Sequence, residues 1–405
     1  MRILLLAEVS AVSVIGGAER VLREHAGGLR RRGHEAAIVA RMPPDDQRPT
    51  VVQGGIAEHR FPVSRHHALA FVWSSLKQSV RTFDHACGSI PADAVVMYQA
   101  LAGAGTILRR RPCARQWIYV CLSLAHEEYL SRVCRTGTWL NRLQTAVNER
   151  VRLWIERLVM RRCDRVIVLS EFMRERVKAV HHVPEDRIRL IPGAADLTTF
   201  RPAGDLAAVR QSLKLPPAKT LLFTVRNLVP RMGLEHLIAA MQQLGEEGRD
   251  CLLLIGGEGT LRSSLERQIQ EQGLADRVAL LGFILEKDLP KYYQVADLVM
   301  MPTYELEGFG LVTVEALACG TPVLGTPVGA IPEVLVRLDP ELVAEGTDSR
   351  SLATAMQRIL RRFRERPNER ARLAAAGRAL VEREYNWNRH IEQLEAVLQE
   401  TREAS

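Results

Sequence analysis

Lysine, aromatic residues and long apolar runs are scarce in this 405-residue chain. Only six lysines stand beside 49 arginines, so the net charge of +8 comes almost entirely from arginine. Phe, Trp and Tyr make up 5% of the residues, which disfavours a surface that stacks nucleic-acid bases on aromatic rings. No uninterrupted apolar stretch approaches the ~18 residues of a membrane span, so we expect no transmembrane helix.

Metal and cofactor motifs are also missing. The seven cysteines are scattered, and neither they nor the histidines form pairs with the spacing of zinc ligands. There is no P-loop, and there is no Asp-x-Asp motif, which a metal-dependent transferase needs to hold a cation on a diphosphate. We therefore predict no metal site and no cofactor. An odd number of scattered cysteines favours a reducing, cytoplasmic compartment.

What is present is a repeated alternation of short apolar strands and helices. Such strands, apolar on both faces, are typical of a parallel sheet covered by helices on each side. In the first half, strands are expected at Ile3–Ala7, Ala36–Ala40, Ala94–Tyr98, Trp117–Val120 and Arg165–Leu169. In the second half, they are expected at Thr220–Val225, Cys251–Ile255, Val278–Leu281, Leu298–Met301 and Pro322–Gly325.

Turn-forming residues near position 190 separate these two series. We predict an α/β protein of two Rossmann-like, doubly wound domains, residues 1–194 and 195–380. Beyond about Leu352 the pattern is helical and highly charged. We expect its last part, residues 381–405, to be a helix that packs back on the first domain.

The segment from Glu305 to Val323 carries the strongest chemical signal. Glu307 follows a predicted strand, and Gly308 and Gly310 allow the backbone to approach a ligand closely. A helix is expected to begin near Gly310, and the free N–H groups and positive dipole end of a helix attract a phosphate. Glu315, further along this helix, has a carboxylate that can accept two hydrogen bonds from a vicinal diol such as a ribose.

This segment resembles the E-x7-E region of the retaining GT-B glycosyltransferases of glycosyltransferase family four. The resemblance extends over nearly the whole chain, and the order and spacing of its motifs make it specific. The other matching segments are Gly16–Glu19, Arg32–Glu35, Asp164–Ser170, Ile191–Phe200, Val225–Leu237, Ile255–Gly259 and Asn386–His390. It implies two domains that face each other across a cleft.

The resemblance also implies roles for individual residues. Glu307 would contact hydroxyls of the donor sugar, Glu315 would hold the ribose, and Arg226 would bind the diphosphate and stabilise the leaving group. The other expected contacts to the donor come from Gly16, Gly17, Arg231, Gly257, Gly308, Phe309, Gly310 and Leu311.

Two positions depart from the family pattern. The family usually has a lysine where this chain has Met232, and either the neighbouring Arg231 replaces that cation or the cation is absent. The family commonly has a histidine where this chain has Cys121. His126 is the nearest candidate for that catalytic role, and the alternative is a purely structural histidine.

The segment 109–165 is the most basic, with thirteen arginines against five acidic residues. Within it, apolar residues recur at helical spacing: Trp139, Leu140, Leu143, Val147, Val151, Trp154, Ile155 and Leu158. This stripe either docks on an anionic membrane or faces the protein core, with a solvated basic face opposite.

Together these features predict a retaining, metal-independent glycosyltransferase that moves a sugar from a nucleoside-diphosphate sugar to a carbohydrate or lipid-linked hydroxyl. Cell-envelope polysaccharide, lipopolysaccharide or glycolipid synthesis would be its setting, in the cytoplasm or at the inner face of the plasma membrane. The alternatives are a sugar-nucleotide epimerase and a non-catalytic subunit that binds a sugar nucleotide. A nucleic-acid partner is not expected, because the positive net charge is the only feature of the sequence that suggests one.

Overall fold

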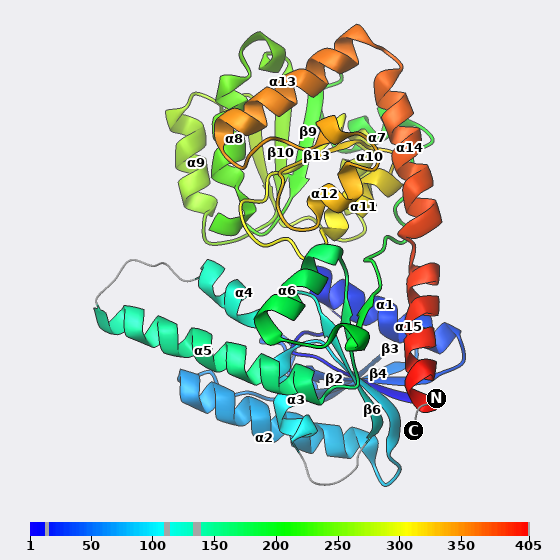
Figure 1. Ribbon diagram of the computed structural model, residues 1–405. Helices are drawn as coiled ribbons and strands as arrows, with labels where there is room; N and C mark the ends of the chain where they lie inside the picture. The colour runs from blue at the N-terminus through cyan, green and yellow to red at the C-terminus, as the bar shows by residue number, and fades with distance from the viewer. Residues whose placement is uncertain (13–15, 109–113, 133–138, 404–405) are drawn as a thin grey trace. The chain divides into compact units, whose positions relative to one another are not determined.

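The computed structural model describes residues 1–12, 16–108, 114–132 and 139–403, which fall into two compact units (Figure 1). The first unit consists of Met1–Pro192 and Trp387–Ser405, and the second consists of Gly193–Asn386. None of the described helices is both long and apolar enough to cross a membrane.

The first unit contains an eight-stranded sheet in the order β3-β4-β2-β1-β5-β6-β7-β8, parallel except for the β3–β4 hairpin. Its strands are β1 (Arg2–Leu6), β2 (Glu35–Arg41), β3 (Thr50–Gln53), β4 (Ile56–Phe61), β5 (Ala92–Met97), β6 (Ala114–Cys121), β7 (Arg165–Val168) and β8 (Ile188–Leu190). The central strands are buried because helices cover both faces of the sheet (Figure 1). The sequence pattern does not identify β3, β4 or β8, which are short or contain polar residues.

The helices of this unit are α1 (Gly17–Arg31), α2 (Ala68–Cys87), α3 (Ala100–Ile107), α4 (Ala125–Arg132), α5 (Trp139–Arg162), α6 (Glu171–His181) and α15 (Trp387–Glu403). Helix α15 joins the unit by packing on α1, where a Cβ added to Gly28 would lie only 2.5 Å from Cγ1 of Ile391. This close contact fixes the last helix of the chain against the first.

The second unit contains a five-stranded parallel sheet in the order β11-β10-β9-β12-β13. Its strands are β9 (Thr220–Val225), β10 (Cys251–Gly256), β11 (Val278–Gly282), β12 (Leu298–Met301) and β13 (Val323–Gly325). Its helices are α7 (Leu206–Ser212), α8 (Leu234–Gln243), α9 (Arg262–Glu271), α10 (Leu289–Val295), α11 (Leu311–Ala318), α12 (Ile331–Leu335), α13 (Ser349–Glu365) and α14 (Glu369–Glu384). The two sheets confirm the predicted α/β class.

The helical tail consists of three helices, α13, α14 and α15. Helix α13 ends before Arg366, α14 ends before Tyr385, and α15 begins at Trp387. The change from the second unit to the first therefore falls between Asn386 and Trp387, six residues beyond the boundary that the sequence suggests.

Candidate functional site

The strand order of the second unit determines where its ligand site should lie. The connections run from β9 to one side of the sheet and from β12 to the other, so the order reverses between these two neighbouring strands. In open parallel sheets, ligands bind beyond the carboxyl ends of the strands at such a reversal. Arg226 directly follows β9, and Glu307 lies in the loop after β12.

Arg226 and Glu307 form a nearly buried ion pair at this point. Nη2 of Arg226 contacts Oε2 of Glu307, and the two side chains are 5% and 13% exposed. Nη2 also donates to Oγ1 of Thr303 at 2.9 Å, and that hydroxyl lies 3.3 Å from Oε2 of Glu307. Thr303 therefore supports both members of the pair, a role that the sequence analysis did not assign to it.

Two methionine sulfurs complete the surroundings of this guanidinium. Sδ of Met232 lies 3.2 Å from Nε of Arg226, and Sδ of Met301 lies 3.3 Å from Nη1. Met232 is thus part of the packing around the cation. Arg231 reaches elsewhere, because its Nη1 donates to the carbonyl of Leu306 at 2.8 Å. Whether Arg231 also reaches a diphosphate remains a prediction.

The loop that carries Glu307 is held by close backbone contacts. The backbone carbonyl oxygen of Glu307 accepts a hydrogen bond from Ala330 N at 3.1 Å. A Cβ on Gly329, whose φ is +60°, would lie 2.1 Å from the same oxygen, so only glycine fits there. Leu306 also has a positive φ of 58°. The carboxylate of Glu307 is therefore fixed by its loop as well as by Arg226.

Helix α11 begins beside this loop. Gly310 is its N-cap, with φ +80° and no side chain to cap the helix, while Thr313 N bonds back to the Gly310 carbonyl at 2.8 Å. Phe309 turns inward, with its ring 5.8 Å from that of Tyr385. The backbone from Gly308 to Leu311 thus lies at the N-terminal end of α11, whose partial positive charge favours the binding of an anion.

Glu315 lies deeper in α11 and is 2% exposed. Its Oε2 accepts a hydrogen bond from the hydroxyl of Tyr293 at 3.1 Å.

Gly257, the first residue after β10, lies in close contact with the backbone of Arg226. A Cβ on this glycine would lie 1.9 Å from the carbonyl oxygen of Arg226. The second unit therefore brings Arg226, Gly257 and Glu307 together, whereas the ribose contact of Glu315 remains a prediction.

The remaining candidates belong to the first unit. Gly16 caps α1, and its N–H donates to Oε2 of Glu19 at 3.1 Å; Gly17 is the first residue of that helix. His126 lies in the first turn of α4, with a side chain only 10% exposed that faces Glu156 and His181. Contacts of these residues with a sugar remain predictions.

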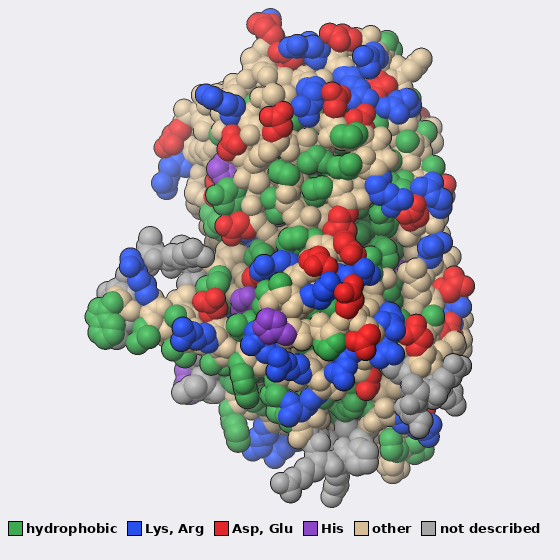
Figure 2. All heavy atoms as spheres, in the orientation of Figure 1, with side chains coloured by type: hydrophobic (Ala, Val, Ile, Leu, Met, Phe, Trp, Pro, Cys, Tyr) green, Lys and Arg blue, Asp and Glu red, His purple; other side chains and the backbone are tan. Residues whose placement is uncertain are grey.

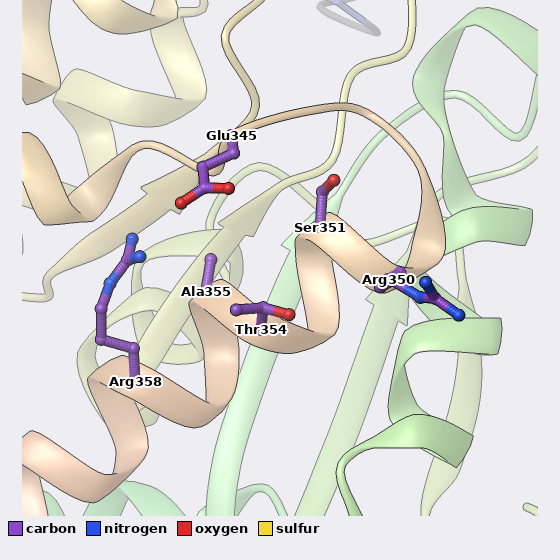
Figure 3. Close-up of a pocket in the computed structure, with 6 residues that line it drawn as sticks. All are labelled: Glu345, Arg350, Ser351, Thr354, Ala355 and Arg358. Atoms are coloured by element: carbon purple, nitrogen blue, oxygen red, sulfur yellow. The ribbon is translucent and has the colours of Figure 1, made fainter.

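The pocket drawn in Figure 3 is not this site. It lies at α13 and is lined by Glu345, Arg350, Ser351, Thr354, Ala355 and Arg358, none of which the sequence singles out. Its volume of about 140 Å³ is smaller than the cavities that hold ligands of nucleotide-sugar size.

Two protein families match this chain, one over most of the first unit and one within the second. Residues 16–194 match the family described as "Glycosyl transferase 4-like domain", and residues 207–379 match "Glycosyl transferases group 1". Sucrose-phosphate synthase from Thermosynechococcus elongatus has a similar structure, with a TM-score of 0.84, 25% identity and 100% of both chains covered.

Curated relatives match over shorter stretches. D-inositol 3-phosphate glycosyltransferase of Mycobacterium sp. strain KMS is 36% identical over 181 residues, which are 44% of this chain and 40% of the relative. The GDP-mannose-dependent monoacylated alpha-(1-6)-phosphatidylinositol monomannoside mannosyltransferase of Corynebacterium glutamicum is 34% identical over 217 residues, 52% of this chain and 55% of the relative. The alignments thus span about half or less of these relatives.

Proposed function

The chain belongs to the group 1, family-four type of GT-B glycosyltransferases, and from that premise we propose that it transfers a sugar with retention of configuration. The donor is a nucleoside-diphosphate sugar, and the acceptor is a hydroxyl of a carbohydrate or lipid-linked molecule. The observation that carries the proposal is the Arg226–Glu307 pair, which lies at the reversal of strand order beside the N-terminus of α11.

The chemistry follows from the charges at this site. The diphosphate binds at the N-terminus of α11 and near Arg226, both of which stabilise negative charge as the sugar–phosphate bond breaks. Glu307, whose Oε2 is paired with Nη2 of Arg226, presents a carboxylate that accepts hydrogen bonds from sugar hydroxyls. The acceptor attacks from the face that the phosphate leaves, and the departing phosphate accepts its proton.

We also propose that α5 docks on an anionic membrane. The apolar stripe does not face the core at five of its positions, since Trp139, Leu143, Val147, Val151 and Trp154 are between 45% and 71% exposed. Hydrophobic and basic side chains lie along the projecting end of this helix in Figure 2. Exposed Arg150 and Arg161 occupy the same helical face as the stripe. An apolar stripe with arginines beside it suits anionic headgroups, as a lipid-linked acceptor would require.

The experiment that tests the function is a thermal-shift screen of the full chain against UDP-, GDP-, ADP- and TDP-sugars, followed by analysis of the products. We expect one nucleotide class to raise the melting temperature, and the sugar to be transferred only when an acceptor is present. Isomerised donor without acceptor would instead indicate an epimerase. Binding with no turnover for any acceptor would indicate a non-catalytic subunit.

A further inference from the structure

Three side chains that are far apart in the sequence converge inside the first unit. They are His126 from α4, Glu156 from α5 and His181 from α6. One potential ligand atom from each lies within 4.8 Å of the other two. The side chains of Glu156 and His181 are completely buried, and that of His126 is 10% exposed.

The hydrogen bonds of this cluster leave some of its ring nitrogens without a partner among the described residues. Glu156 accepts from Oη of Tyr119 at 3.1 Å and from Ala125 N at 3.1 and 3.2 Å. Nε2 of His181 lies 3.1 Å from Oε2 of Glu156, but without the geometry of a hydrogen bond. Among the described residues, no hydrogen-bond partner is found for either ring nitrogen of His181 or for Nδ1 of His126.

Buried polar atoms without partners are costly, and so is a buried carboxylate without a counter-charge. The nearby cation, Arg176, pairs with Glu127. Two imidazoles and one carboxylate form a donor set that suits zinc, whose charge would offset that of Glu156. In a tetrahedral zinc site, ligand atoms lie about 3.3 Å apart, given metal–ligand distances of about 2.0–2.1 Å. Small side-chain rotations would bring the three groups to that separation.

We propose that His126, Glu156 and His181 bind a divalent transition-metal ion, for which Zn²⁺ is the best match. The metal ties α4 and α6 to α5, the helix that carries the exposed apolar stripe. Its role is structural and independent of the proposed sugar transfer. An imidazole of His126 that ligates zinc is not free to contact a sugar hydroxyl, so the metal also decides between the two roles of this histidine.

The test uses the full chain without a histidine tag, stripped with a chelator and then titrated with Zn²⁺ in a calorimeter. We expect binding of one Zn²⁺ per chain, a higher melting temperature, and the visible absorption of a four-coordinate site when Co²⁺ replaces Zn²⁺. His181→Gln and Glu156→Gln should each weaken Zn²⁺ binding by more than about 100-fold, because loss of a ligand exceeds the effect of losing a supporting residue.

His182→Gln is the matched control, since His182 is the exposed neighbour of the buried His181. This variant should bind Zn²⁺ as the wild type does. The proposal is overturned if the wild-type chain binds no Zn²⁺, an outcome that does not depend on whether any variant folds. It is also overturned if His181→Gln and Glu156→Gln both bind Zn²⁺ normally, because the ion then occupies surface histidines.

Discussion

Sδ of Met232 lies 3.0 Å from Nη2 of Arg226, so the methionine side chain packs against the guanidinium. The family usually has a lysine at position 232. The cation at Arg226 is already paired with Glu307. A lysine at position 232 would place a second positive charge in the same buried space. The departure from the family pattern is thus accommodated by the local packing.

We therefore predict that Met232→Lys lowers the free energy of unfolding of the ligand-free protein by about 2 kcal/mol, mainly through repulsion of Arg226. Urea denaturation measures the change. Met232→Leu, which conserves volume without adding charge, should cost less than about 1.5 kcal/mol. Equal stability of the two variants would show that a cation fits here without strain.

Sugar transfer should survive removal of divalent cations. The sequence has no Asp-x-Asp motif, and in the mechanism proposed above Arg226 and the N-terminus of α11 supply the positive charge for the diphosphate. Turnover is measured with and without EDTA, well below the melting temperature. Activity that vanishes in EDTA and returns with Mn²⁺ would contradict this prediction.

Two buried histidines should make the protein sensitive to acid. Nδ1 of His390 lies 2.6 Å from the Pro192 carbonyl, an acceptor, so the neutral ring donates there and accepts at Nε2. Nε2 of His25, 2.7 Å from Nε2 of His390, must then donate, and Nδ1 of His25 accepts from the Tyr98 hydroxyl at 2.7 Å. A further proton on either ring breaks this chain of hydrogen bonds.

Burial lowers the pKa of His390 to about 4 and that of His25 well below 6.5. The unfolded chain takes up these protons near pH 6.5 and the folded chain only at lower pH, so stability is full above pH 6.5 and is lost as the pH falls toward 4. We expect a loss of up to about 1.4 kcal/mol per pH unit for each histidine. Urea denaturation between pH 7 and 4.5 tests this.

The control for this prediction is His66→Gln, because His66 is exposed. That variant should keep the wild-type dependence on pH, whereas His390→Gln should flatten it. An unchanged slope in His390→Gln would assign the acid sensitivity to other groups.

Membrane docking through α5 should depend on salt, because exposed charges are screened within ~10 Å at 0.1 M ionic strength. We expect the protein to sediment with anionic vesicles at low salt and to be released at high salt. Arg150→Glu combined with Arg161→Glu should abolish binding, and so should Trp139→Ser combined with Trp154→Ser. Arg157 is left unchanged because its Nη2 donates to the Val180 carbonyl at 2.5 Å. A wild-type protein that ignores these vesicles at every salt concentration would remove the proposal.

The sequence predicts the strands that are continuous apolar runs, which include all five of the second sheet, but it misses β3, β4 and β8 of the first sheet because these are short or contain polar residues. It also places Arg226 and Glu307 correctly after β9 and β12, since residues at strand ends are local features. It does not show which face of α5 is buried: Glu156 lies inside and Trp154 outside, against the apparent pattern of polarity. The convergence of Glu156 with His126 and His181 depends on how three helices pack, which spacing in the sequence does not reveal.

The central claim, that the second unit binds the donor through separate contacts to nucleotide and sugar, is tested most directly by calorimetry with the nucleoside diphosphate identified in the screen. We predict that Glu315→Ala weakens binding of the diphosphate by about tenfold or more, the loss of one charge-assisted contact. Glu307→Ala should leave that affinity within about twofold of wild type and slow turnover instead. Equal loss of diphosphate affinity in both variants, or no loss in Glu315→Ala, would contradict the account.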